Sequence, residues 1–73
     1  MLYLWQSRAG LFVIERRGER WHPIFDGESL GSYASPQQAL DDLCGGHTFS
    51  LAGGIDSSRL DLPEDLSEWI EGK

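Results

Sequence analysis

The stretch LFVIERRGERWHPIFDGESL, residues 11–30, contains the turn signals that decide the fold. Its first part, Leu11–Arg16, is rich in β-branched and aromatic residues and predicts a strand. Gly18 can adopt a positive φ and predicts a turn, after which Arg20–Phe25 predicts the next strand. The pair Asp26-Gly27 is a strong hairpin signal, because both central positions of a tight turn can require positive φ.

The segments on either side extend this pattern to an antiparallel meander over residues 2–33. Before it, Leu2–Ser7 predicts a strand that ends at the tight-turn pair Ala9-Gly10. After it, Glu28–Tyr33 predicts a short fourth strand. Pro23 cannot donate a ladder hydrogen bond, so we expect its strand to lie at an edge or to pair on one side only there. The meander is therefore predicted to have three or four strands.

A helix is predicted over residues 36–44, packed on one face of the sheet. Ser35 is an N-cap candidate, Pro36 suits the first helical position, and Gln38 can complete a capping box. Gly45-Gly46 can end the helix in a left-handed cap. The apolar stripe that faces the sheet consists of Leu40, Leu43 and Cys44.

The remaining residues complete one small α+β domain that spans residues 1–73. A short strand is expected at 48–51 and a short C-terminal helical segment at 63–70. In that segment Leu66, Trp69 and Ile70 have the i, i+3, i+4 spacing of a helix face that could dock on the core.

Composition favours a small acidic protein of the cytoplasm. The chain of 73 residues has eight aromatic residues for its core and one cysteine, so no internal disulfide can form. No targeting signal and no stretch of about 20 apolar residues is visible, so we expect a soluble protein without membrane contact.

The net charge of −6 lies entirely in the second part of the chain. Residues 1–40 have four arginines and four acids, whereas residues 41–73 have eight acids against Arg59 and Lys73. This balance repels phosphate backbones at long range and argues against nucleic acid as the default partner.

The run GESLG, residues 27–31, has the G-x-S-x-G spelling of the hydrolase nucleophile elbow. That elbow requires a strand, a strained turn and then a helix. Here Gly27 completes a hairpin turn, and no helix directly follows the run. We therefore interpret Ser29 as a surface serine and predict no catalytic residue.

Cys44 and His47 have C-x-x-H spacing, but the only other histidine is His22 and no second cysteine exists. A structural zinc site usually has four such ligands in two pairs, so we predict no metal site and no cofactor. Cys44 also lies at the C-terminal end of its helix, where the helix dipole disfavours a thiolate nucleophile.

Arginine and tryptophan side chains near the turns of the first three strands form a possible binding face. Such a surface suits anions, bases or protein. The alternative is that the tryptophans pack inward and the arginines pair with nearby glutamates. The candidate residues are Trp5, Arg8, Arg16, Arg20 and Trp21.

Two resemblances bear on this face. The run from Leu30 to Ala39 resembles the strand-to-helix segment of the plant ethylene-response-factor DNA-binding domain, a three-stranded sheet with one helix. That resemblance implies DNA contacts from the face that contains the arginines, although DNA binders are basic and this chain is acidic. The runs Trp5–Gly10 and Ser35–Leu43 are similar to those of a group of short bacterial proteins that has no assigned activity.

The function predicted from the residues is a non-catalytic protein-interaction or regulatory module with a protein partner. Binding of nucleic acid through the Arg/Trp face is the first alternative, and a small enzyme is the second. The chain is expected to be a monomer or a weak homodimer.

Overall fold

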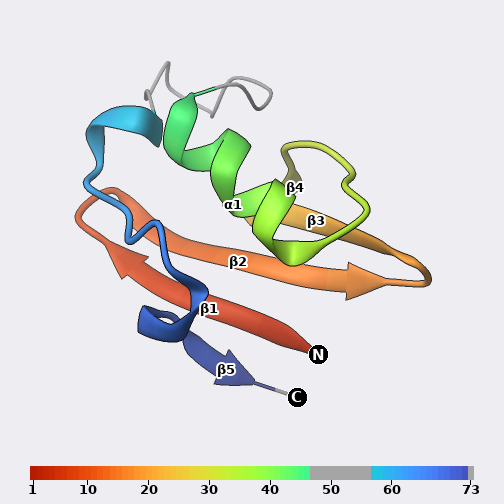
Figure 1. Ribbon diagram of the computed structural model, residues 1–73. Coiled ribbons are helices and arrows are strands. Elements are labelled where there is room, and N and C mark those ends of the chain that lie inside the picture. Colours follow the sequence, from red (N-terminus) through yellow and green to blue (C-terminus); the bar gives the residue numbers. More distant parts are fainter. Residues whose placement is uncertain (47–56, 73) are drawn as a thin grey trace.

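The computed structural model describes residues 1–46 and 57–72 and shows an α+β fold, as predicted (Figure 1). One antiparallel sheet of five strands has the order β4-β3-β2-β1-β5, and one α-helix packs on it. Between the helix and the last strand, the described residues 57–69 include two short 3-10 turns. The elements are β1 (Leu2–Ser7), β2 (Gly10–Arg17), β3 (Arg20–Phe25), β4 (Glu28–Ser29), α1 (Pro36–Gly45), 3-10 turns at Ser57–Arg59 and Leu66–Glu68, and β5 (Ile70–Gly72).

The turns predicted from glycine positions join β1 to β2, β2 to β3 and β3 to β4. Asp26 and Gly27 have φ values of 53° and 79°, as a tight hairpin turn with two positive-φ positions requires. Gly18 has φ 65° in the turn before β3. The local conformations of these turn residues therefore determine where the meander reverses direction. The strand predicted at 48–51 lies outside the described residues.

Pro23 lies within the sheet, because β3 pairs with both β2 and β4. On the β4 side the carbonyl of Pro23 accepts from Leu30 N at 2.7 Å, but proline has no N–H to return a bond. The expected strand from Glu28 to Tyr33 is therefore interrupted. β4 ends at Ser29, and pairing resumes at Tyr33, whose N and O both bond Trp21 at 2.8 Å.

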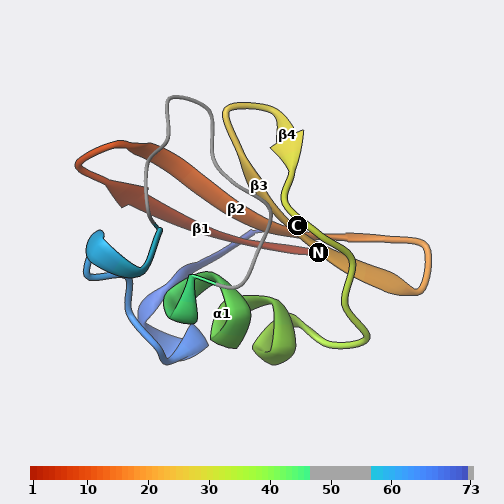
Figure 2. The ribbon, with the colours of Figure 1, turned by 90° about the horizontal axis from the view of Figure 1, so that it is seen from above.

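The helix forms as its caps predict and ends at Gly45, one residue later than expected. The Ser35 hydroxyl accepts from the backbone N of Gln38 at 3.2 Å, and Pro36 begins the helix. Gly46 has φ 74° and closes the helix with a left-handed cap. Figure 2 shows that α1 lies on one side of the sheet only.

The core fills the space between α1 and the sheet. β2 contributes Phe12 and Ile14, both fully buried, and the rings of Phe12 and Phe25 are 4.6 Å apart. The helix contributes fully buried Leu40 and Leu43. The buried residues of this cluster are Phe12, Ile14, Trp21, Phe25, Leu30, Ala39, Leu40, Leu43, Leu62 and Trp69.

The C-terminal segment is helical only over Leu66–Glu68 and then continues as a fifth strand, β5, which the sequence analysis did not predict. β5 pairs with β1, with Ile70 opposite Leu4. Trp69 is 4% exposed and packs in the core, whereas Ile70 is 67% exposed. These neighbours point to opposite sides because strand side chains alternate, so the expected common helix face does not form.

Two leucine-to-alanine substitutions test the difference between the two sides of the sheet. Leu40→Ala should lower the free energy of unfolding by about 2–5 kcal/mol, because it removes a fully buried side chain from the core. Leu11→Ala should cost less than about 1 kcal/mol, because Leu11 is 45% exposed. Urea unfolding at low micromolar concentration measures both, and equal losses would contradict this assignment.

Candidate functional site

The side of the sheet opposite α1 has its own aliphatic surface. Direct pairing places Ile70, Leu4, Val13 and Ile24 in one row across β5, β1, β2 and β3. By the alternation of β1 and β2, Leu2 and Leu11 lie on either side of this row. We call this surface the open face; it consists of Leu2, Leu4, Leu11, Val13, Ile24 and Ile70.

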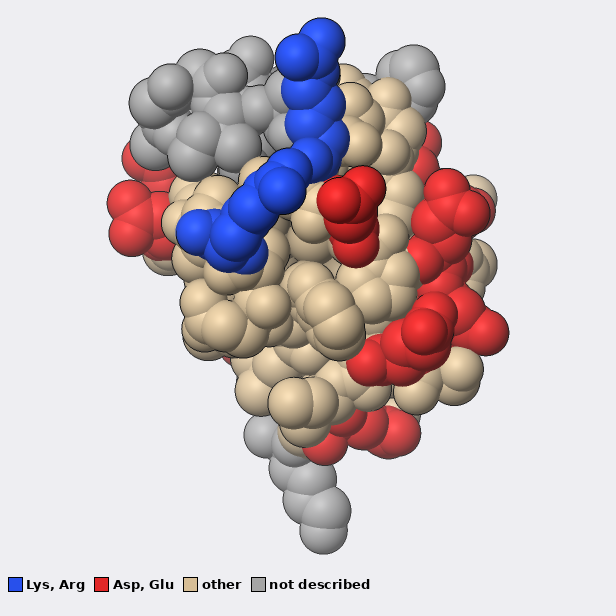
Figure 3. Space-filling model, turned by 90° about the vertical axis from the view of Figure 1, so that its left-hand side faces the viewer, with Lys and Arg blue, Asp and Glu red and all other residues tan. Residues whose placement is uncertain are grey.

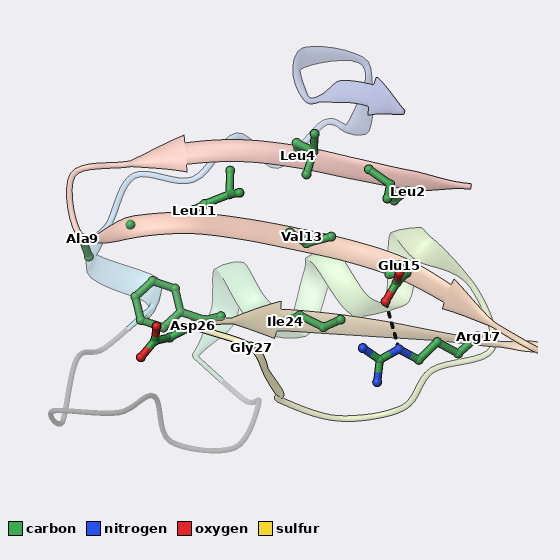
Figure 4. A pocket seen from close by; sticks show the side chains of 12 residues that line it. Leu2, Leu4, Ala9, Leu11, Val13, Glu15, Arg17, Ile24, Asp26 and Gly27 are labelled. Atoms are coloured by element: carbon green, nitrogen blue, oxygen red, sulfur yellow. Dashed lines mark hydrogen bonds and ion pairs between the residues drawn. The ribbon is translucent and has the colours of Figure 1, made fainter. Parts of the chain in front are cut away.

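The open face is hollowed rather than flat. A broad depression of about 780 Å³ runs over β1, β2 and β3, and five of its lining residues are open-face aliphatics (Figure 4). Leu2 leans over the edge strand, since a Cβ on Gly72 would come within 2.7 Å of the Leu2 Cδ1 atom. Ile24 is 7% exposed yet does not belong to the core cluster under α1. The aliphatic groups therefore form a second surface that is separate from the core.

Charged groups lie at the two ends of the depression. At one end Arg17 Nε contacts Glu15 Oε2 at 2.9 Å, and Asp26 lies at the opposite end (Figure 4). Arg20 of β3 lies opposite Arg17 of β2 in the strand register. It is therefore at the same end of the sheet as the Glu15–Arg17 ion pair. The middle of the depression has no charged lining residue. Its charged groups lie at the ends, with the arginines at one end and Asp26 at the other.

Most acids of the second part of the chain belong to other elements. Asp41 and Asp42 lie on α1, and the Glu64 carbonyl lies 3.3 Å from Gln37 Nε2 on the same helix. Figure 3 shows acidic side chains mostly along one side of the molecule, with others at the opposite edge and one beside the basic side chains. The lining of the depression has two acids, Glu15 and Asp26, and one arginine, Arg17.

The two tryptophans predicted for a binding face lie on the α1 side of the sheet. Trp21 is 9% exposed, and its ring centroid is 6.0 Å from that of Tyr3. Trp5 packs against the core, with its ring 6.4 Å from that of Trp69. Both rings therefore contribute to the packing under the helix.

The three arginines of that predicted face point to different places. Arg8 donates to the carbonyl of Arg59, and Arg16 Nε donates to the Gly18 carbonyl at 3.0 Å. Arg20 donates to the hydroxyl and the carbonyl of Ser32, at 3.0 Å and 2.9 Å. Because Arg16 pairs with Trp21 and Arg20 with Arg17, neighbouring strand positions place Arg20 and Trp21 on opposite faces.

The open face was not predicted from the sequence, although the chain contains a signal for it. Leu11 and Val13 alternate with Phe12 and Ile14, so β2 is apolar at both sets of positions. Such a strand needs cover on both sides, and one helix supplies cover on one.

Ser29 of the G-x-S-x-G run does have an imidazole nearby. His22 Nδ1 lies 2.9 Å from Ser29 Oγ, and the hydroxyl donates to the Gly31 carbonyl at 2.9 Å. The hydroxyl of Ser29 is thus engaged with a backbone carbonyl as well as with the imidazole. Ser29 lies in β4 after the hairpin turn, and the next helix begins only at Pro36. The arrangement therefore lacks the elbow that aims a catalytic serine.

A fluorophosphonate probe tests the interpretation of Ser29. We expect no adduct on the native protein at neutral pH, because Ser29 lies in a strand after a hairpin turn and lacks the elbow that positions a catalytic serine. Intact-mass spectrometry measures the adduct, with Ser58→Ala as the control and Ser29→Ala as the assignment variant. An adduct that Ser29→Ala abolishes and Ser58→Ala keeps would contradict this interpretation.

Cys44 is half-buried beside the segment that follows the 3-10 turn at Ser57–Arg59. Its Sγ lies 3.7 Å from the Leu62 carbonyl and 3.8 Å from that of Pro63. Burial raises the pKa of the Cys44 thiol to about 11, and the carboxylates of Glu64 and Asp41 add to the rise. The thiol is thus protonated at neutral pH, the opposite of what a nucleophile requires.

Metal binding has little support from the residues that can be described. His47, the partner of Cys44 in the C-x-x-H spacing, lies outside residues 1–46 and 57–72. Within those ranges no group of three or more His, Cys, Asp and Glu side chains is placed to hold a metal ion.

The raised pKa of Cys44 predicts the pH dependence of alkylation. In the native protein the rate with iodoacetamide should rise with a midpoint near pH 11, against an ordinary thiol value of 9.0. In urea the midpoint should return toward 9.0, because burial and the nearby carboxylates are lost. Since the folded pKa is the higher one, this thiol stabilises the fold below pH 9.0 and loses that contribution as pH rises toward 11. A native midpoint at or below the urea value would contradict the prediction.

Comparison of the chain with protein-family models, curated proteins and solved structures gave no match. The resemblances to the ethylene-response-factor domain and to the short bacterial proteins therefore stay predictions. Among the described residues, no helix has the length and apolar character needed to cross a lipid bilayer. The function of this α+β domain is accordingly argued from the geometry of its surfaces.

Proposed function

We propose that this protein is a non-catalytic protein-interaction module and that its open face binds an aliphatic surface of another protein chain. The observation that carries the proposal is the row of aliphatic side chains across four strands on the side away from α1, in which Ile70 is exposed, Leu4 and Val13 are partly buried and Ile24 is buried. Leu11 and Ile70, which belong to this surface, are 45% and 67% exposed.

The aliphatic side chains of the open face form one contiguous surface. Single exposed aliphatic residues are common on protein surfaces, but contiguous apolar patches on monomers are often functional. Full burial of a leucine or isoleucine contributes about 1.5–3 kcal/mol, so covering Leu11 and Ile70 would supply a favourable free energy of association. A partner that covers the open face gains this contribution without the unfolding of any element.

The shape of the depression favours a protein over a small ligand. Small-molecule sites enclose most of their ligand and direct a few polar groups at it. Here the depression is broad, its middle is aliphatic, and its charged groups lie only at the ends. A second folded surface fits such a shape better than an isolated small molecule does.

The charges do not favour nucleic acid. Binding to phosphates depends on several cations that act on one surface. Arg8, Arg16 and Arg20 make hydrogen bonds at separate places, and Arg17 is paired with Glu15. On the part of the chain that the structure describes, these arginines therefore do not form one basic surface for DNA or RNA.

Photo-cross-linking in cells of the native host tests the proposed function. A benzophenone amino acid at Leu11 should give an adduct with a protein, because Leu11 lies on the open face. The same amino acid at Gln38, which is exposed on α1, is the matched control and should give none. The additional substitution Ile70→Lys should abolish the Leu11 adduct, because it puts a charge in the aliphatic row.

Two results would contradict the proposed function. One is the absence of any adduct at Leu11. The other is an adduct that forms equally at Gln38 and survives Ile70→Lys.

A further inference from the structure

We propose that the hairpin between β2 and β3 binds one phosphate group between Arg17 and Arg20. These two arginines lie directly opposite each other and flank the turn that contains Gly18. The hairpin is at the end of the sheet away from the turn between β1 and β2 (Figure 1). The inference goes beyond the proposed function and does not depend on which protein covers the open face.

Arg17 and Arg20 lie on the same side of the sheet. Arg17 is two positions after Glu15 in β2, and both residues line the depression on the side away from α1 (Figure 4). Arg20 is four positions before Ile24 in β3, and Ile24 lines the same depression. The alternation of strand side chains therefore places both arginines on this side, whereas Arg16 points to the other side.

The two arginines repel each other, and an anion between them would relieve the repulsion. Like charges directly opposite in an antiparallel pair are destabilising, because the Cβ atoms are only about 4.5–5.5 Å apart. Arg17 Nε contacts Glu15 Oε2 at 2.9 Å, but Arg20 has no ion-pair partner among residues 1–46 and 57–72. Two arginines with one paired glutamate leave an excess of positive charge on this side of the hairpin.

The guanidinium of Arg20 is held in one orientation and keeps donors for a ligand. Its Nε donates to the Ser32 hydroxyl at 3.0 Å, and its Nη2 donates to the Ser32 carbonyl at 2.9 Å. These two bonds use one edge of the planar group, so the second edge, formed by both Nη atoms, can donate to two oxygens of an anion. Both acceptors on Ser32 are uncharged, so they do not neutralise the cation.

Arg17 supplies donors from the neighbouring strand. Its Nε bonds Glu15, and within the described residues its Nη atoms make no hydrogen bond. The tetrahedral oxygens of a phosphate can accept from guanidinium groups on two strands. The two oxygens of a carboxylate lie in one plane and match a single guanidinium edge. The arrangement of Arg17 and Arg20 therefore favours a phosphate group over a carboxylate.

The site suits a single phosphate of a small molecule rather than a nucleic-acid backbone. A backbone is bound by several cations along one surface, and only two arginines meet here. Arg16 donates to the Gly18 carbonyl on the other side of the hairpin, and Arg8 donates to the carbonyl of Arg59. We therefore expect weak binding, with a dissociation constant in the millimolar range.

Nuclear magnetic resonance of the purified, isotopically labelled chain tests the inference. Inorganic phosphate is the probe and is titrated at neutral pH and constant ionic strength, because surface charges are sensitive to salt. Saturable shifts should occur at the backbone amides of Arg17, Gly18, Arg20 and Ser32. Acetate should bind about tenfold more weakly or less, since it cannot engage both arginines.

A pair of arginine variants separates the site from general electrostatic attraction. Arg20→Gln should raise the dissociation constant for phosphate about tenfold, because it removes a charge-assisted bidentate contact. Arg16→Gln is the matched control, since it removes the same charge from the same hairpin but on the other side of the sheet. It should leave the constant within about twofold. The dispersion of the amide signals shows that both variants are folded.

A glutamate variant should change the affinity in the opposite direction. Glu15→Gln removes the carboxylate that occupies Arg17, so phosphate should bind more tightly than to the native chain. Glu19→Gln is its control, because Glu19 is an exposed acid of the same turn and has no ion pair with either arginine. Its effect should be smaller than that of Glu15→Gln.

Several results would overturn the phosphate site. One is a titration that does not saturate, and another is equal weakening by Arg20→Gln and Arg16→Gln, which would indicate a non-specific ion only. Equal affinity for acetate would contradict the assignment to phosphate. A single-stranded oligonucleotide that binds much more tightly than inorganic phosphate, and loses this affinity in Arg16→Gln, would contradict a site for one phosphate. None of these results bears on the Leu11 photo-adduct, so the proposed function is tested separately.

Discussion

The side chains of β2 alternate between two apolar surfaces, and among residues 1–46 and 57–72 a helix covers only one of them. Phe12 and Ile14 pack under α1, while Leu11 and Val13 point to the other side. A helix of 10 residues can lie across one face of a sheet, but it cannot reach the opposite face. The aliphatic row, the separation of the core from the open face and the proposed function all depend on this imbalance.

The edges of the sheet are less open than its free face. On one side Pro23 has no N–H to donate, so β4 stops after two residues and the chain returns to the sheet at Tyr33. Gly31 lies in this bulge with φ 154°, and a Cβ there would come within 2.8 Å of the Tyr33 ring. On the other side β5 is three residues long. Such short edges offer little backbone for strand addition, so the face is the better surface for a partner.

The polar groups His22 and Ser29 form local hydrogen bonds within the sheet. His22, Ser29 and the Gly31 carbonyl make a chain of hydrogen bonds across β3 and β4 that holds the bulge. Cys44 is protected by burial and by carboxylates, which raise its pKa. Both groups are explained by their structural surroundings, which leaves the interaction surface as the main candidate for function.

The hairpins and the helix could be predicted from short stretches of sequence, because each depends on local backbone chemistry. Asp26-Gly27 needs only its own φ values, and Ser35, Pro36 and Gly46 act on the backbone within a few residues. The end of the chain could not be predicted in this way. The spacing of Leu66, Trp69 and Ile70 fits a helix, yet pairing with β1, more than sixty residues earlier in the chain, makes Ile70–Gly72 a strand.

The candidate site shows the same division. The arginines and tryptophans are close in sequence, but Arg20 and Trp21 are neighbours in β3, so the alternation of strand side chains places them on opposite faces. The alternation of apolar residues in Leu11–Ile14 was already visible in the chain and implied two apolar surfaces. Which surface α1 would cover, and which aliphatic residues of four strands would meet on the other, was decided only when distant segments packed together, because burial is a property of the whole fold.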